Sequence, residues 1–121
     1  MSKITILFVE SRGEWHRIWG EILKDESRAL FHASSIDEAE ELFLEHPEID
    51  IIAMSACISG HEPDTIQLVQ KMRQSFKGPM IAMSSILVHR KTLCEAGCNL
   101  ESEKLVLPDL VLKIIAQMAM Q

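Results

Sequence analysis

Short apolar runs alternate with amphipathic stretches along the whole chain. The runs typical of strands lie at 4–9, 28–33, 49–54, 80–83 and 100–105. The stretches with helical spacing lie at 14–24, after Ser35, at 63–76, at 87–96 and from Pro108 to about 118. This alternation predicts a parallel sheet with helices on both faces. The first, third and fourth runs are apolar throughout, as central strands of such a sheet are.

Local signals predict how several helices face and end. A stripe of large apolar side chains in the first helical stretch predicts its core face. Its members are Trp15, Ile18, Trp19, Ile22 and Leu23. Ser35 with Glu38 three residues later predicts a capping box, and Gly97 predicts a C-terminal cap. Five strand–helix units in 121 residues indicate an α/β fold, a flavodoxin-like doubly wound five-stranded parallel sheet of order 2-1-3-4-5.

Composition narrows the class of protein. The length predicts a single domain over 1–121, and 47% hydrophobic with 25% charged residues is typical of a soluble globular chain. A net charge of −6 argues against nucleic-acid binding. No apolar stretch approaches the roughly 20 residues of a membrane span. Three cysteines, an odd number, without a signal peptide predict a cytoplasmic protein.

Polar residues follow the predicted strands at the edge where this architecture places ligand chemistry. These strand ends carry Glu10 and Ser11, Ser55, Ser84 and Lys104. In this register the chain resembles, from end to end, the receiver domain of two-component response regulators. The resemblance rests on four segments, 3–11, 49–60, 79–84 and 96–104, and on no single diagnostic motif. It implies the receiver fold and a role in signal transduction.

Several positions depart from the receiver pattern. Receivers end the first strand in two acids and the third in a phosphoaccepting Asp; here Glu10 keeps one acid, while Ser11 and Ser55 replace the others. Leu105 stands where the family has a cis-forming proline, and Glu101 at its aromatic switch position. Mg²⁺ prefers oxygen ligands that include carboxylates, and a serine hydroxyl is a weak nucleophile without a base. We therefore expect a degenerate pseudo-receiver with no cofactor, no metal and no aspartyl phosphorylation.

Two residues of this degenerate site leave alternatives open. Lys104 either binds an anion or a partner's carboxylate, or it pairs with Glu10 or is exposed to solvent. Ser84 either keeps the receiver's switch role or bonds the backbone at a strand end.

Two other functions compete with the pseudo-receiver. One is a response regulator phosphorylated at a non-standard residue, and the other is a small enzyme that reuses the fold. Ser55, His61 and Asp64 supply a nucleophile, a base and an acid in sequence. The Gly-x-Ser-x-Gly elbow that would present such a serine is missing, so we expect no enzyme.

An interaction surface is predicted near the last helix, which is apolar over more than the stripe of about 100° needed to cover a sheet. Its expected members are Ile86, Leu87, Val88, Glu101, Glu103 and Leu112. The first three are apolar where receivers carry a polar loop, and they either join this surface or fold into the core. In the family, the fourth helix, fifth strand and fifth helix form the usual partner face. We expect a protein partner with a basic surface, or a homodimer through the last helix.

Overall fold

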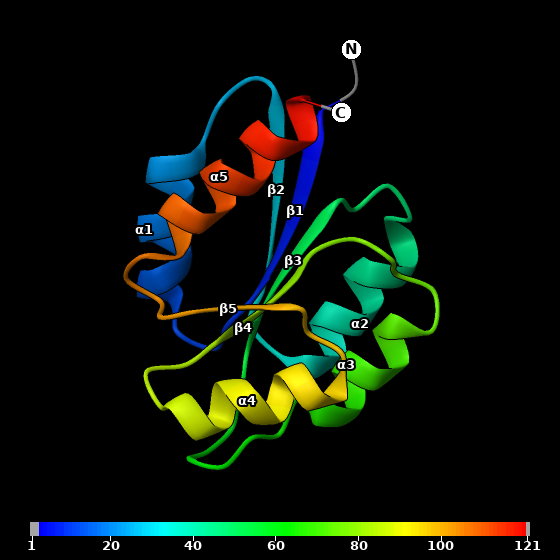
Figure 1. Ribbon diagram of the computed structural model, residues 1–121, viewed down its shortest axis with the longest axis vertical. Coiled ribbons are helices and arrows are strands. Elements are labelled where there is room, and N and C mark those ends of the chain that lie inside the picture. The colour runs from blue at the N-terminus through cyan, green and yellow to red at the C-terminus, as the bar shows by residue number, and fades with distance from the viewer. Residues whose placement is uncertain (1–2, 121) are drawn as a thin grey trace.

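The computed structural model describes residues 3–120 as a five-stranded parallel sheet between two layers of helices (Figure 1). The strands are β1 (Ile4–Val9), β2 (Arg28–Ala33), β3 (Ile51–Ser55), β4 (Met80–Met83) and β5 (Leu100–Ser102). Their order is β2-β1-β3-β4-β5, with every neighbouring pair parallel. The predicted fold class is confirmed.

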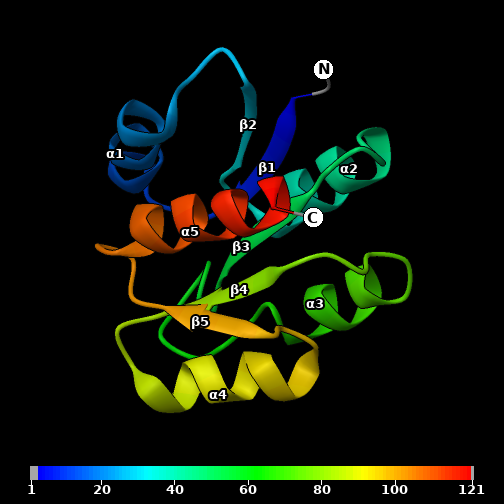
Figure 2. The same ribbon diagram turned by 45° about the horizontal axis from the view of Figure 1, so that its top comes forward.

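Helices cover both faces of this sheet, as Figure 2 shows. They are α1 (Gly13–Leu23), α2 (Ile36–Glu45), α3 (Ile66–Arg73), α4 (Leu87–Ala96) and α5 (Leu107–Ala119). Helices α1 and α5 lie on one face, and α2, α3 and α4 on the other. A hydrophobic core lies on each face of the sheet, and successive β1 side chains point into the two cores alternately. Ile6 and Phe8 pack in the core beneath α1 and α5. Leu7 and Val9 pack in the core beneath α2, α3 and α4. No helix within 3–120 is long and apolar enough to cross a membrane.

The predicted caps form with one change. The Ser35 hydroxyl accepts the Glu38 N–H at 3.1 Å, as expected. The Glu38 carboxylate accepts the Ser34 N–H at 2.7 Å, one residue earlier than in a capping box. Gly97 ends α4 with φ of 150°, a conformation that favours glycine.

The predicted core stripe of α1 is wrong in two positions. Ile18 is 38% exposed and Ile22 is 54% exposed, whereas His16, Trp19 and Leu23 are buried. The buried arc of α1 is rotated towards β2 because His16 contacts the β2 side chain of His32 (described below). A polar residue therefore occupies a core position that hydrophobicity alone does not reveal.

Of the element boundaries that differ from prediction, those of β3, β5 and α3 bear on the site. β3 begins at Ile51 and includes Ser55 as its last residue. β5 ends at Ser102, which leaves Lys104 in the loop before α5. α3 begins at Ile66, because the Asp64 carboxylate accepts the backbone N–H groups of Ile58 and Ser59, both at 2.8 Å, and holds the preceding segment as a loop.

Candidate functional site

The strand ends converge on a cleft of about 630 Å³ at the carboxyl edge of the sheet. Its walls come from the loops after β1, β3, β4 and β5. The lining residues used below are Glu10, Arg12, Trp15, Cys57, Ile86, His89, Glu103, Lys104 and Leu105. The predicted positions Ser11 and Ser84 also line it, whereas Ser55 lies beneath, fully buried.

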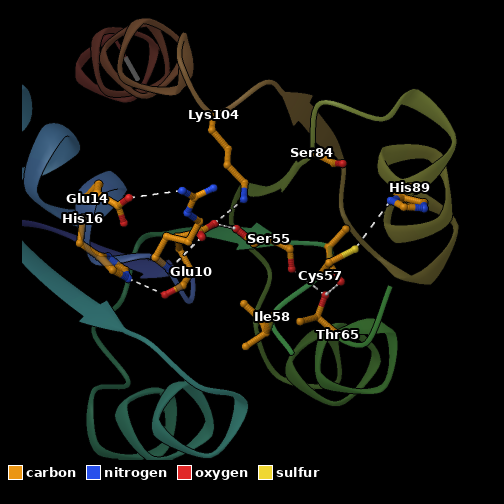
Figure 3. Close-up of polar contacts among 12 residues, drawn as sticks. Glu10, Glu14, His16, Ser55, Cys57, Ile58, Thr65, Ser84, His89 and Lys104 are labelled. Atoms are coloured by element: carbon orange, nitrogen blue, oxygen red, sulfur yellow. Dashed lines mark hydrogen bonds and ion pairs between the residues drawn. The ribbon is translucent and has the colours of Figure 1, made fainter. Parts of the chain in front are cut away.

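Glu10 is the centre of the polar contacts at the base of the cleft (Figure 3). One of its carboxylate oxygens accepts the Lys104 ammonium at 2.7 Å and a hydrogen bond from the Ser55 hydroxyl. Its other oxygen accepts the backbone N–H of Arg12 at 3.0 Å. Glu10 is fully buried, so these three donors replace the water that the charge loses. The reading in which Lys104 pairs with Glu10 is confirmed.

The charge on Glu10 is stable at neutral pH. Burial by itself raises the pKa of this carboxyl, but the hydrogen bonds from Lys104, Ser55 and the Arg12 backbone outweigh it, and the pKa is lowered. The cluster of Glu10, Ser55 and Lys104 is therefore one buried anion, a partly buried cation paired with it and a buried hydroxyl bonded to the anion. We call these three residues the internal cluster.

Helix α1 holds both ends of the ion pair, which sequence reasoning missed. The His16 side chain bonds the backbone carbonyl of Glu10 through Nε2 at 2.7 Å. The Trp19 indole N–H donates to the backbone carbonyl of Lys104 at 2.9 Å. Both residues sit in the middle of a helix and not at a strand end, so the pattern that finds ligand sites did not include them.

The remaining predicted site residues have ordinary structural partners. The Ser84 hydroxyl accepts the Ile86 N–H at 3.0 Å, so the strand-end reading of Ser84 is confirmed. The Ser55 carbonyl accepts the Thr65 hydroxyl at 2.8 Å. The Ser55, His61 and Asp64 triad is not assembled, because the Ser55 hydroxyl is directed to Glu10 and Asp64 binds backbone amides.

The residues present do not fit the Mg²⁺ site that the receiver fold implies. A magnesium site needs several oxygen ligands with open coordination positions. Here Glu10 is the one carboxylate among the three acidic positions of the family, and its oxygens already bind Lys104, Ser55 and Arg12. No group of three or more potential ligands of the His, Cys, Asp and Glu types occurs within residues 3–120.

The cysteines are not activated for chemistry. The Cys57 sulfur lies 3.7 Å from His89 Nδ1 across the cleft, yet burial, followed by the charge of Asp64, raises the pKa of Cys57. Burial likewise raises the pKa of Cys94 and, most of all, of Cys98, to about 12. Thiols with raised pKa values are weak nucleophiles at neutral pH.

Large apolar side chains border the cleft on the α4 and α5 side. We call this group the apolar rim: Ile86, Leu87, Val88, Leu105 and Val106, which are 47% to 73% exposed. Residues 86–88 are exposed, so the reading in which they fold into the core is wrong. Ile86 and Leu105 line the same cleft, so the rim joins two loops. Leu112, also exposed, does not line it.

The carboxylate of Glu101 forms ion pairs within the domain. Its carboxylate accepts Arg90 at 3.1 Å and Lys91 at 2.6 Å, and these bonds are the main causes that lower the pKa of Glu101. The Arg90 guanidinium also donates to the Ser84 carbonyl at 2.7 Å. Glu101 therefore ties α4 to β4 and β5, and Glu103, which is exposed, is the acid left beside the rim.

Several solved structures with a similar architecture are response regulators or their receiver domains. No protein-family model and no curated protein matches the sequence. A two-component response regulator from Clostridium difficile is similar at 17% identity with a TM-score of 0.81, covering 96% of this chain and 98% of that chain. A putative response regulator from Chloroflexus aurantiacus has 17% identity, a TM-score of 0.81, and coverage of 99% and 100%. A signal receiver domain from Colwellia psychrerythraea has 17% identity, a TM-score of 0.79, and coverage of 98% and 100%. These likenesses, together with the strand order, show that the chain has the receiver fold of two-component response regulators.

Proposed function

We propose that this domain is a pseudo-receiver that acts in cytoplasmic signal transduction through protein contacts, without phosphorylation and without catalysis. The observation that carries the proposal is the internal cluster. In it, the lysine that would face a phosphoryl group instead neutralises the one remaining acid at 2.7 Å. Phosphoryl transfer depends on positioning and on metal and cation charge, and the cluster leaves no free carboxylate for the metal.

Phosphorylation at Ser55 is disfavoured by its surroundings. Ser55 is fully buried, and its hydroxyl donates to Glu10. A phosphate there would bring close to two negative charges against the Glu10 carboxylate in a buried site. An approaching phosphodonor would also have to displace Lys104 from its partner.

The apolar rim supports contact with a protein. Isolated exposed apolar residues are ordinary, but five large ones at the start of α4 and in the loops before α4 and α5 form the kind of patch that marks an interface. Apolar surfaces of this kind bind through a few anchor side chains that enter a cleft. The cleft beside Ile86 and Leu105 supplies such a recess.

The charges around the rim favour a basic partner. Four of the nearby cations are paired inside the domain: Lys104 with Glu10, Arg12 with Glu14, and Arg90 and Lys91 with Glu101. A fifth, Lys113, lines a hollow together with Val106 and the acid Asp109. Glu103 makes no ion pair with any residue in 3–120. The unbalanced charge beside the rim is therefore negative, which complements a segment with an apolar anchor flanked by Lys or Arg.

The test compares matched surface variants against a partner identified by affinity capture. Leu105 is 73% exposed in the rim, and Leu44 is 72% exposed on α2, so Leu105→Ser and Leu44→Ser remove similar surface at different places. Glu103→Lys is matched by Glu45→Lys, also at an exposed glutamate. We expect affinity to fall tenfold or more for the two rim variants and to stay unchanged for the controls. Equal effects within each pair would contradict the proposal.

A second copy of the chain is the other partner to test. Helix α5 exposes Leu112 and Ala116, and Met120, the residue directly after the helix, continues this stripe at the same four-residue interval. Sedimentation of the wild type and of Leu112→Asp distinguishes the cases. A dimer that dissociates in the variant supports a homodimer through α5, and a wild type that stays monomeric at high concentration excludes it.

A further inference from the structure

Two histidines face each other between α1 and β2. His16 Nδ1 lies 2.8 Å from His32 Nδ1, while His16 Nε2 lies 2.7 Å from the Glu10 carbonyl oxygen. The His32 ring stacks on Phe8 with centroids 5.1 Å apart. The neighbours of the pair thus fix both rings in place.

The geometry limits how many protons the pair can hold. A carbonyl oxygen only accepts hydrogen bonds, so His16 Nε2 carries a proton. The short contact between the two Nδ1 atoms has room for one proton. In the neutral pair His32 Nδ1 donates this proton to His16 Nδ1, and a pair with one extra proton still shares a single proton at this contact. If both rings were cationic, two N–H groups would point at each other across 2.8 Å, and the contact would break.

The surroundings do not stabilise a charged pair. No carboxylate in the described residues bonds to either imidazole. From β1, the Glu10 carboxylate is directed to Lys104 and Ser55. From α1, Arg17 is exposed, and from β2, the Arg28 guanidinium bonds the Leu23 carbonyl. Burial, followed by the charge of His16, lowers the pKa of His32.

Helix α1 links the histidine pair to the internal cluster through two hydrogen bonds. His16 bonds the backbone of Glu10, and three residues along the same helix Trp19 bonds the backbone of Lys104. These are the two residues of the buried ion pair. A displacement of α1 therefore acts on both sides of the cluster at once.

We propose that His16 and His32 form an acid-sensitive latch, which holds α1 on the loops after β1 and β5 and opens when a second extra proton enters the pair. The inference rests on this geometry and stands whether or not the domain binds a protein partner. Both histidines take up a proton freely in the unfolded chain, with a pKa of about 6.5. A histidine whose folded pKa is lowered stabilises the fold above that value, and the stabilisation is lost as the pH falls from about 6.5 towards the folded pKa. Acidification below about pH 6.5 should therefore loosen α1 and the cleft.

The first experiment titrates the histidine side chains of the wild-type protein by ¹⁵N NMR from pH 7.5 to 5. We expect the folded pair to take up no more than one proton. We also expect the Trp19 indole N–H signal, which reports the bond to Lys104, to change over the pH range in which the latch opens. Two independent titrations, both complete in the folded protein with the Trp19 signal unchanged, would overturn the proposal.

The second experiment measures the folding equilibrium constant by urea unfolding at pH 7 and pH 5. Each histidine that folding keeps neutral lowers this constant by about 25-fold between the two values. In His32→Gln, the decrease of the folding equilibrium constant from pH 7 to pH 5 should be smaller than in the wild type by about this factor. His46→Gln is the control, because His46 also stacks on an aromatic ring, that of Phe31, but lies 3.1 Å from the Glu48 carboxylate. A loss that is the same in His32→Gln as in the wild type would refute the latch, and if that variant does not fold, the wild-type titration decides.

Discussion

Replacing Lys104 with methionine removes the ammonium that neutralises Glu10 and keeps a side chain of similar length. Glu10 is fully buried, and in the variant it retains the Ser55 hydroxyl and the Arg12 N–H as donors. Breaking a buried ion pair by removing one partner costs about 3–5 kcal/mol, because the other charge stays buried. We expect Lys104→Met to lose that much of a total stability of about 5–15 kcal/mol.

The loss should depend on pH in a defined direction. In the wild type the pKa of Glu10 is lowered, so the pair stabilises the fold above the ordinary carboxyl pKa, and this is lost as the pH falls through the folded value. Lys104→Met removes the hydrogen bond that most strongly lowers the pKa of Glu10, while burial still raises it, so this pKa should rise. Glu10 can then take up a proton in the folded state, and the destabilisation should shrink between pH 7 and pH 5.

Urea unfolding followed by Trp15 and Trp19 fluorescence measures these differences. Lys91→Met is the control, because Lys91 pairs with Glu101 at the surface and exposed pairs contribute little. The double variant Glu10→Gln with Lys104→Met contains no buried charge and should be more stable than Lys104→Met alone. If Lys104→Met loses as little stability as Lys91→Met and the loss does not depend on pH, the view that Lys104 neutralises Glu10 within the site is refuted.

Three further results are expected. Gly97→Ala should lose about 1–3 kcal/mol, because its φ is 150° and a Cβ would lie 2.5 Å from Arg73 Cγ; Gly13→Ala, with nothing within 4 Å, is the control, and equal urea midpoints would contradict the reasoning. Trp19→Phe should lose about 1–3 kcal/mol, because the Lys104 carbonyl loses its indole donor; an unchanged midpoint would show that α1 does not hold this loop. Restoring acids in Ser11→Asp with Ser55→Asp should produce a low-millimolar Mg²⁺ response in tryptophan fluorescence that the wild type lacks; a variant that also gives none would show that more than the acids is missing.

Much of the fold could be predicted because the sheet follows from hydrophobic periodicity. β1, β2, β4 and α4 have their predicted bounds. β1 and β4 are marked by apolar runs and α4 by its cap Gly97, whereas β2 carries a weaker apolar run that His32 interrupts. The end of β5 was placed too late. Its polar residues carry no apolar signal, and its pairing with β4 stops at Ser102.

The sequence predicts where the candidate site lies in the fold, but it does not predict which side chains contact one another there. The strand-end rule placed Glu10, Ser55 and Lys104 at one edge, and the fold brings them together. The part played by His16 could not be found this way. Its partner His32 is 16 residues away, on a strand whose register with β1 sets Phe8 opposite His32, and no local pattern encodes that pairing.

The predicted acidic surface also depends on contacts that the sequence does not reveal. Glu101 and Glu103 look equivalent in sequence, two residues apart on a polar strand. In the structure, the cations of α4 reach Glu101 and leave Glu103 exposed. Which carboxylate stays free depends on how α4 packs beside β5, and that is a tertiary property.

We infer that this domain functions without phosphorylation, with Lys104 paired to Glu10. The most direct measurement is the affinity for the captured partner before and after incubation with Mg²⁺ and a small phosphodonor, with the intact mass recorded in parallel. We predict no gain of a phosphoryl mass and an unchanged affinity. A mass gain of one phosphoryl group accompanied by a changed affinity would contradict the claim.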